Sequence, residues 1–417
     1  MRGGPGEDAA TTGPASAVTI DTGLASLATL PAVATLGRHE LLGRIATGGM
    51  AEIFLARVAG PRDVARLVVV KRLLPHVAEN AAVVDAFVQE AKLGSRLAHP
   101  SLCAITDFGH EDDAYFIAME WVRGASLRAL MERTRGKLPI HVAARIFADL
   151  ATALHHAHTA TDDAGRPLGV VHRDVTPENV VVSWGGVPKL LDFGIAKSAF
   201  DPRKTEAGVL KGKLAYISPE QYRGDALDAR SDVFALSVCL YEALTGESLY
   251  ERASEYETVA AIVLDASVPS PRAVRADVPE AIDELVRAGL TKDRDARLPS
   301  ADALARGLES WLAKEHGAPV RHADVARSLD ALFPGMSRRP PALDRRPPTT
   351  RASTPPSARK RTSSEEMRVL ALGAEIDHDE DRLLGDARRT RRNWMLLALL
   401  VTALSIGVVA WVALTPH

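Results

Sequence analysis

Three polar side chains in residues 170–194 have the types and the order that phosphoryl transfer from a metal-bound nucleotide requires. They are Asp174, Asn179 and Asp192, each near a short apolar run that is typical of a strand. One aspartate can accept the proton of a substrate hydroxyl, while the asparagine and the other aspartate can hold Mg²⁺ against the phosphates. The stretch is therefore a candidate catalytic site, provided that the fold brings these side chains to one cleft.

A candidate phosphate-binding turn lies upstream, between two alternating apolar runs in residues 42–56. Alternation on both sides of a small-residue turn predicts a β-hairpin. Backbone N–H groups can approach phosphates only where the side chains are small. The turn consists of Ala46, Thr47, Gly48, Gly49, Met50 and Ala51. By itself this is weak support, since Gly-Gly turns mostly just join strands.

An ion pair between Lys71 and Glu90 is the next candidate feature. Lys71 ends the apolar strand pattern 67–70, and Glu90 lies in 80–97, where apolar residues recur near helical spacing. Each residue taken alone is ordinarily a solvated strand end or helix face. Together they carry opposite charges and could form an ion pair.

The middle of the chain changes from two strand patterns, 102–108 and 114–122, to two helix patterns, 126–133 and 141–159. His155, His156 and His158 close the second helix pattern. A metal site there is disfavoured, because no matching cysteine or carboxylate cluster accompanies the histidines.

Length and composition bound the remaining possibilities. A chain of 417 residues is expected to form two or three segments. Its net charge of −2 gives no global signal for a nucleic-acid partner. Cys103 and Cys239 are far apart and flanked by apolar residues, which favours buried free thiols in a reducing compartment.

The catalytic stretch carries a family resemblance. The order His172-Arg173-Asp174, then Asn179, then Asp192-Phe193-Gly194 resembles the catalytic loop and the magnesium loop of protein kinases. From about Arg38 to about Ala313 the chain is similar to the eukaryotic-like Ser/Thr protein kinases of bacteria. The resemblance implies an α+β fold with two lobes, a small β-rich N-lobe and a large helical C-lobe.

The resemblance also implies roles for single residues. Asp174 would be the catalytic base, Asn179 and Asp192 the Mg²⁺ ligands, and Lys71 with Glu90 the pair that holds the phosphates of ATP. Met119 would be the gatekeeper of the adenine site, followed by the backbone of Glu120–Val122. The implied ATP site comprises Ala46, Thr47, Gly48, Gly49, Met50, Ala51, Ile53, Val69, Lys71, Met119, Glu120, Val122 and Val181.

Residues 195–217 resemble an activation segment, closed by a variant of the family's A-P-E motif at Ser218-Pro219-Glu220. The family places an arginine at Arg297 that pairs with Glu220. Small-molecule phosphotransferases can share the catalytic loop but lack this closing set, so a protein substrate is favoured.

Two departures from the family pattern occur together. Thr176 stands where the family has a lysine that reaches the transferred phosphate, and Lys213 stands where it has a threonine after the activation-segment glycine. We hypothesise that Lys213 supplies the missing cation from the other side of the cleft.

A regulatory phosphorylation site is also expected in the activation segment. Thr205 matches the usual acceptor of bacterial family members, and Arg173 and Lys197 would form its basic pocket. An unmodified, solvated threonine is the alternative.

The two ends of the chain have other compositions. Residues 1–37 are expected to be a disordered tail and 314–333 to hold an additional C-lobe helix. Residues 334–394 are expected to form a Pro- and Arg-rich linker, which is extended and disordered over 334–364 and ends in a basic juxtamembrane segment. Residues 395–414 have no charge and no proline and would span about 30 Å as a helix, the thickness of a bilayer core. Arginines precede this predicted transmembrane helix, so the kinase domain is expected on the cytoplasmic side of the inner membrane.

These features predict an ATP- and Mg²⁺-dependent Ser/Thr protein kinase that signals at the membrane, with protein substrates and no nucleic-acid partner. A homodimer that phosphorylates itself in trans is compatible with this assignment. The alternative is a catalytically weak or dead, nucleotide-binding scaffold at the membrane, which Ala46, Ala51 and Thr176 favour. Tyrosine specificity is a lesser alternative, because the loop after Asp174 lacks the lysine typical of Ser/Thr enzymes.

The hypothesis about Lys213 makes a kinetic prediction. Replacing Lys213→Ala is expected to slow turnover by about a hundredfold or more, because a positioned cation near developing phosphate charge is worth several kcal/mol, roughly. Steady-state kinetics check this, and a near-normal turnover number refutes the compensation.

Overall fold

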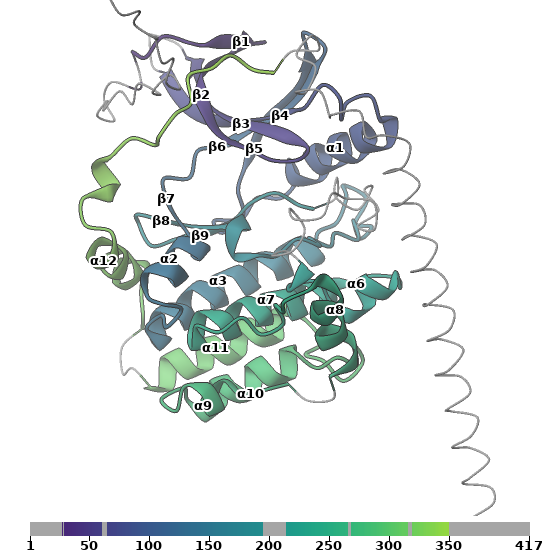
Figure 1. Cartoon of the computed structure of the whole chain (residues 1–417), viewed down its shortest axis with the longest axis vertical. Helices are drawn as coiled ribbons and strands as arrows, with labels where there is room; N and C mark the ends of the chain where they lie inside the picture. The colour runs from purple at the N-terminus through teal and green to yellow at the C-terminus, as the bar shows by residue number, and fades with distance from the viewer. Residues whose placement is uncertain are drawn as a thin grey trace, which may run out of the picture. The chain divides into compact units, whose positions relative to one another are not determined.

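A six-stranded antiparallel sheet and helix α1 form the N-lobe (Figure 1). The strand order is β1-β2-β3-β4-β6-β5. The elements are β1 Ala34–Leu36, β2 His39–Thr47, β3 Ala51–Ala59, β4 Ala65–Leu73, α1 Ala81–Gly94, β5 Ile105–Glu111 and β6 Ala114–Glu120. The hairpin β2–β3 and its turn occur where alternation predicted them.

The structure is a computed structural model that describes residues 27, 29–60, 65–194, 214–265, 268–315 and 319–349. The described part confirms the expected α+β fold, with a β-sheet lobe and a helical lobe. The predictions for Lys197, Thr205, Lys213 and the span 395–414 lie outside the described residues.

Strand β4 shows how alternation divides the two faces of the sheet. Val68 and Val70 are buried in one apolar cluster with Phe54 of β3 and Phe116 of β6. Successive side chains of a strand point to opposite faces, so Lys71 faces the other side. Ile117 of β6 lies opposite Lys71 in the register and packs in the cluster of α1. Helix α1 therefore covers the lysine face of the sheet.

Helix α1 begins at Asn80, whose side-chain oxygen accepts a hydrogen bond from the Ala82 N–H (3.0 Å) and so caps the helix. Phe87 and Ala91 are buried and hold the helix against the sheet. The helix ends at Gly94 rather than at Leu97, where the apolar pattern stops. Since Gly94 has no side chain, Ile105 can pack against it; a Cβ there would lie 2.4 Å from Ile105 Cδ1.

The strand predicted over 102–108 begins later, at Ile105. Its first residues are engaged elsewhere, because the Cys103 N–H donates to the Leu190 carbonyl (2.9 Å) and the Leu190 N–H donates to the Ser101 carbonyl (2.9 Å). This segment therefore crosses toward the C-lobe before it joins the N-lobe sheet.

The C-lobe surrounds two long helices, α3 and α7, and carries a small sheet of order β7-β8-β9 (Figure 1). Its elements are β7 Gly124–Ser126, α2 Leu127–Arg133, α3 Ile140–His158, η3 Pro177–Asn179, β8 Val180–Ser183, β9 Pro188–Leu190, α6 Pro219–Arg223, α7 Ala229–Thr245, α8 Glu255–Leu264, α9 Pro271–Val274, α10 Glu280–Gly289, α11 Ala301–Glu315, α12 His322–Leu332 and η5 Met336–Arg338. Helix α12 is the additional C-lobe helix that the sequence predicts.

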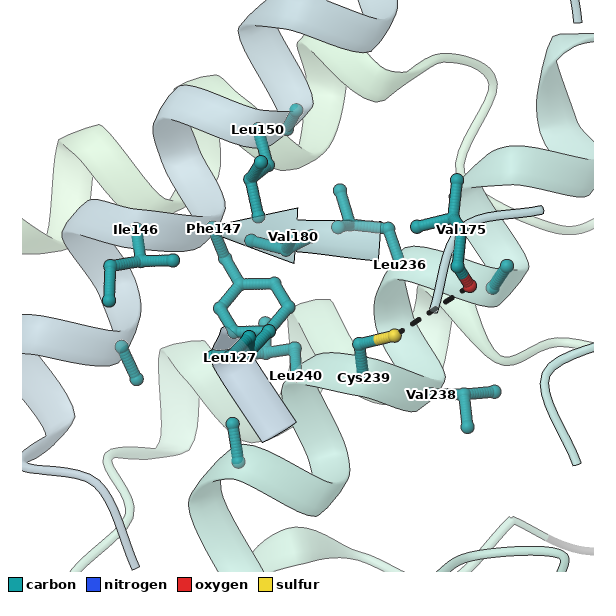
Figure 2. Packing of buried hydrophobic residues seen from close by; sticks show 14 of the residues in the cluster. Leu127, Ile146, Phe147, Leu150, Val175, Val180, Leu236, Val238, Cys239 and Leu240 are labelled. Atoms are coloured by element: carbon teal, nitrogen blue, oxygen red, sulfur yellow. Dashed lines mark hydrogen bonds between the residues drawn. The ribbon is translucent and has the colours of Figure 1, made fainter. Parts of the chain in front are cut away.

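Helices α3 and α7 meet in the apolar centre of the C-lobe core. Figure 2 shows Phe147 of α3 among Leu127, Leu236 and Leu240, all almost fully buried. Cys239 lies in the same core, and its Sγ is 3.8 Å from the Val175 carbonyl oxygen. Burial raises the pKa of the Cys239 thiol well above its usual value, so the thiol stays neutral, and both cysteines are free as expected.

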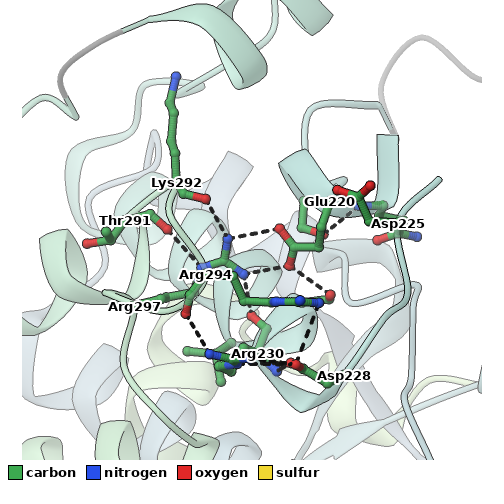
Figure 3. A network of polar contacts seen from close by, with 12 residues as sticks. Glu220, Asp225, Asp228, Arg230, Thr291, Lys292, Arg294 and Arg297 are labelled. Carbon is green, nitrogen blue, oxygen red and sulfur yellow. Dashed lines mark hydrogen bonds and ion pairs between the residues drawn. The ribbon is translucent and has the colours of Figure 1, made fainter. Parts of the chain in front are cut away.

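A buried ion pair joins α6 to the segment between α10 and α11 (Figure 3). Arg297 donates to both carboxylate oxygens of Glu220, at 2.7 and 3.0 Å, and the Ser231 hydroxyl adds a hydrogen bond at 2.8 Å. Both charged side chains are almost fully buried. The predicted pairing of these two residues is confirmed.

The chain after α12 differs from the expected disordered linker as far as Thr349. The backbone of Asp344 pairs with Arg44 of β2, and Thr349 bonds to Glu52 of β3. Figure 1 shows this segment in yellow-green, rising from α12 to the N-lobe strands. Composition suggested disorder because the segment has few apolar residues, but backbone pairing and ion pairs hold it to the lobe.

No helix among the described residues is long and apolar enough to cross a bilayer.

The Glu220–Arg297 pair predicts a large stability loss. Arg297→Met is expected to lower the free energy of unfolding by about 3–5 kcal/mol, because it leaves a buried carboxylate without its partner. Arg306→Met is the matched control. Arg306 pairs with Asp302 at the surface, with 72% of its side chain exposed, so a change within about 1 kcal/mol is expected. Urea unfolding of both variants makes the comparison.

The loss of unfolding free energy in Arg297→Met is expected to depend on pH through Glu220. Burial alone would raise the pKa of Glu220, but the hydrogen bonds and charge of Arg297 lower it from 4.5 to about 2. The ion pair therefore contributes stability above pH 4.5 and loses it as the pH falls toward 2. The deficit of Arg297→Met should shrink over this range. A deficit that grows toward pH 2 would contradict the assignment.

Candidate active site

Lys71 is the point at which a strand, a helix and the Asp192 loop meet. Its Nζ lies 2.6 Å from Glu90 Oε1 on α1 and 3.3 Å from Asp192 Oδ1. The alternation of β4 turns the lysine toward this side of the sheet, and the burial of Phe87 and Ala91 turns Glu90 of α1 toward it. The sequence predicted the pair, and the structure brings Asp192 to it as well.

The two carboxylates fix the charge of Lys71. Burial alone would lower its pKa, but Asp192 and Glu90 raise the pKa above the usual 10.5. The side chain is therefore an ammonium group throughout the physiological range. Its charge is balanced within the protein and faces the loop that carries a candidate metal ligand.

Asp174 and Asn179 lie together in the catalytic loop. The Asn179 side-chain N–H group donates to the Asp174 carbonyl oxygen (2.8 Å) and also to the Asp174 carboxylate. The short helix η3, with Pro177 at its start, supplies the turn between them. Thr176, the residue in the place of the family's lysine, is buried in this turn.

The Asp192 loop contacts the catalytic loop directly. The Gly194 N–H donates to the His172 carbonyl (2.9 Å), and the Leu191 N–H donates to the Asn179 carbonyl (2.8 Å). A Cβ on Gly194 would lie 2.6 Å from Asp174 Cβ, so only glycine permits this approach. Asp192 itself has φ +39°, a conformation that a non-glycine residue keeps only when its surroundings hold it.

Asp232 of α7 bonds to the backbone of the catalytic loop, a contact that the sequence did not predict. Its carboxylate accepts the backbone N–H groups of His172 (2.7 Å) and Arg173 (2.8 Å), and His158 Nε2 lies 2.7 Å away. Arg173 has φ +67°, and these bonds keep its backbone in that strained conformation. The one feature of the sequence that could have indicated this contact is an acidic residue, Asp232, directly before the apolar run 233–236.

The charge of Asp232 is retained despite its burial. Burial raises the pKa of this carboxyl, but the hydrogen bond and charge of His158, then the charge and N–H of His172, lower it below the usual 3.8. His158 thus serves a structural carboxylate. Among the described residues no cluster of histidine, cysteine and carboxylate groups suits a metal ion.

A second missed connection ties the catalytic loop to the chain after residue 214. Arg128 of α2 donates to Glu178 (2.7 Å) and to the Tyr216 hydroxyl (2.6 Å). The Tyr216 hydroxyl in turn donates to the buried Glu242 of α7 (2.6 Å). This chain of bonds fixes the end of the predicted activation segment against the helix that also holds Asp232.

The predicted adenine-site residues line the same side of the N-lobe sheet. Ile53 is paired with Lys71, and Val69 is paired with Met119, so these side chains share the lysine face. In β8 the neighbours of Val181 are buried in the C-lobe core, which turns Val181 to the opposite side.

The predicted adenine-site residues Glu120 and Val122 lie at the connection between the lobes. The Glu120 side chain accepts hydrogen bonds from Lys189 Nζ (2.6 Å) and from the Ala104 N–H (2.8 Å), and Val122 follows in the segment between β6 and β7.

The turn of residues 46–51 is closed by a bond from the Gly48 N–H to the Ala51 carbonyl (2.9 Å). A Cβ on Gly49 would meet no atom within 4 Å, so the tip of the turn is open.

The donor set fits a magnesium nucleotide. Oxygen ligands from a carboxylate and an amide, Asp192 and Asn179, are the kind that Mg²⁺ takes in phosphate-binding sites. The ammonium of Lys71 beside them suits phosphate oxygens. Asp174, in contact with Asn179, could serve a hydroxyl as base.

Comparison with known proteins agrees with this geometry. Residues 39–308 match the protein kinase domain family. The chain is 39% identical over 288 residues to the tyrosine-protein kinase MasK of Myxococcus xanthus. This alignment covers 68% of this chain and 44% of MasK. It is 34% identical over 270 residues to the serine/threonine-protein kinase PknD of Mycobacterium tuberculosis, covering 64% of this chain and 39% of PknD.

Other relatives add to this pattern. The serine/threonine-protein kinase PrkC of Bacillus subtilis is 32% identical over 275 residues, covering 66% of this chain and 40% of PrkC. This chain thus spans less than half the length of these three relatives. The crystal structure of the PknI kinase domain of Mycobacterium tuberculosis shares the fold, with a TM-score of 0.52 and 24% identity, covering 67% of this chain and 98% of that domain.

The role of Asp232 can be tested by its removal. Asp232→Ala is expected to lower the free energy of unfolding by about 3 kcal/mol or more, because two buried backbone N–H groups and His158 lose their acceptor. Asp330→Ala, on the exposed face of α12, is the matched control, with an expected change within about 0.5 kcal/mol. Equal losses in the two variants would show that Asp232 does not hold the loop.

Proposed function

Because this chain belongs to the protein kinase family, we propose that it transfers the γ-phosphate of Mg²⁺-bound ATP to serine and threonine hydroxyls of proteins. The observation that carries the proposal is the contact of Lys71 with both Glu90 and Asp192. Kinases need this ion pair and the Mg²⁺-binding aspartate in place at the same time.

Each residue of the site has one task in this reaction. Lys71, kept charged by its two carboxylates, binds phosphate oxygens, and Asn179 and Asp192 hold Mg²⁺, which supplies neutralising charge to the phosphates. Asp174 accepts the proton of the protein hydroxyl as its oxygen bonds to the γ-phosphorus and the bond to ADP breaks. Asp232 acts through the loop and is a positioning residue.

Two parts of the proposal concern residues beyond the described ones. Lys213 is proposed as the cation that replaces the family's lysine at Thr176. Thr205 is proposed as a regulatory phosphorylation site, with Arg173 and Lys197 as its pocket.

Tyrosine specificity is the second candidate. The name of MasK and the presence of Thr176 instead of a lysine both favour it. The names of PknD and PrkC favour serine and threonine.

A catalytically dead scaffold is the third candidate, favoured by Ala46 and Ala51 in the turn. The contact of Asp174 with Asn179 argues against it, because nucleotide binding alone does not need a general base beside a metal ligand. Attachment to the cytoplasmic face of the inner membrane through 395–414, and action on protein partners there, complete the proposal.

A radiolabel assay tests the activity. The full chain with [γ-³²P]ATP and Mg²⁺ is expected to label itself or a generic acceptor protein. Asp174→Ala should lower the rate by about 10²–10⁴-fold, the usual contribution of a general base. Asp163→Ala, in an exposed loop, is the control and should retain the wild-type rate.

Two further readings of the same assay separate the candidates. Chelation of Mg²⁺ should abolish labelling. Acid hydrolysis of the labelled product should release phosphoserine and phosphothreonine. Release of phosphotyrosine alone would establish the second candidate, and a wild-type chain that binds ATP without labelling any acceptor would establish the scaffold.

A further inference from the structure

Residues 340–349, here called the strap, pair with β2 at Arg44, beyond residues 39–41, where β1 pairs with the same strand. The Arg44 N–H donates to the Asp344 carbonyl (2.8 Å), and the Asp344 N–H donates to the Arg44 carbonyl (2.9 Å). The two side chains also form an ion pair at 2.6 Å. Backbone pairing of this kind adds a segment to a sheet edge without any apolar periodicity in its sequence.

Gly43 of β2 makes room for the strap. A Cβ at this position would lie 2.8 Å from Leu343 Cβ and 3.2 Å from the Asp344 carbonyl oxygen. Leu343 packs on the buried cluster that includes Leu42 and Leu55, and Trp121 of the segment between the lobes packs on the same cluster. The strap is thus held by an apolar contact as well as by polar ones.

Glu52 is the point where the strap ends and three strands meet. Its side chain is 0% exposed and accepts from Arg44 of β2 (2.5 Å) and Arg72 of β4 (3.1 Å). Thr349 donates to the same carboxylate through its hydroxyl (2.8 Å) and its backbone N–H (3.1 Å). Arg72 also donates to the Thr349 carbonyl (2.8 Å), which closes the network.

Glu52 lies beside the turn that the proposed function places over the phosphates. It pairs with Thr47, the last residue of β2, across the hairpin. A shift of Glu52 therefore moves the base of that turn. The chain that leads into the strap follows α12 of the C-lobe and is bonded to the segment between the lobes, where Arg123 donates to the Ser337 carbonyl.

We propose that the strap is a positioning element of the nucleotide site. The contact of Thr349 with Glu52 holds the β2–β3 hairpin in the position in which its turn can bind the phosphates of ATP. Glu52 touches neither substrate nor metal in this scheme and acts through the hairpin. The proposal rests on the proposed function only for its effect on ATP; the ordering of the hairpin by the strap stands on the contacts above.

Substitutions in the full-length chain test the strap. Thr349→Val removes the hydroxyl but keeps the volume, and Leu343→Ala removes the apolar contact. Each is expected to raise KM for ATP by about twofold to tenfold, the size of one lost hydrogen bond or small contact, with a smaller change in kcat. The control variant Thr349→Ser keeps the hydroxyl, so its KM for ATP should equal that of the wild type.

Hydrogen exchange gives a readout that needs no activity. In both strap variants the amides of β2 and β3 should exchange about threefold faster or more, while those of α7 keep their wild-type rates. Thr159→Val is the control, because that exposed hydroxyl bonds only within the end of α3. It should leave KM and exchange in the hairpin unchanged.

The outcomes separate the two proposals. Unchanged KM and unchanged hairpin exchange in Thr349→Val and Leu343→Ala would overturn the role of the strap. Faster exchange in α7 to the same extent as in the hairpin would also overturn it, since the strap would then serve general stability alone. A wild-type chain without phosphate transfer would overturn the proposed function, while the exchange comparison would still decide the strap.

Discussion

The structure depends on a single buried ammonium group that two carboxylates share. Lys71 comes from a strand, Glu90 from a helix and Asp192 from a loop of the other lobe. A buried charge without a partner is costly. Each of the three elements is therefore held in place by the ion pairs that Lys71 forms with Glu90 and Asp192. The contact between the two lobes at this site therefore depends on an electrostatic constraint.

Buried carboxylates do comparable work in the C-lobe. Asp232 turns the apolar helix α7 into a support for the catalytic loop, and Glu220 with Arg297 fixes the end of the predicted activation segment. Each is satisfied by several hydrogen bonds, which is the condition for a charge to remain in a protein core. The functional loops are thus attached to the core by polar bonds at a few defined points, in addition to buried apolar residues such as Val175 and Phe193.

The sequence predicted the parts of the site that follow from local pattern. The motif order located Asp174, Asn179 and Asp192, because these residues lie within a short window of the chain. Lys71 and Glu90 were identified through the resemblance to kinases that this order implies, since pattern alone makes each of them an ordinary solvated residue. The partners of Asp232 are 59 and 60 residues distant, so no local pattern identifies them. The strap was missed for a related reason: Asp344 and Arg44 are 300 residues apart, and its polar, proline-containing sequence is also typical of disordered segments.

The strap changes where the folded unit ends. The family match stops at residue 308, but Glu52 is shielded from water by residues as distant as Thr349. A chain cut after α11 would leave a carboxylate and two arginines of the N-lobe facing solvent at an open strand edge, and Gly43 without the neighbour that its small size accommodates. Such an edge is a template for pairing with another chain, so a shortened protein would be prone to self-association.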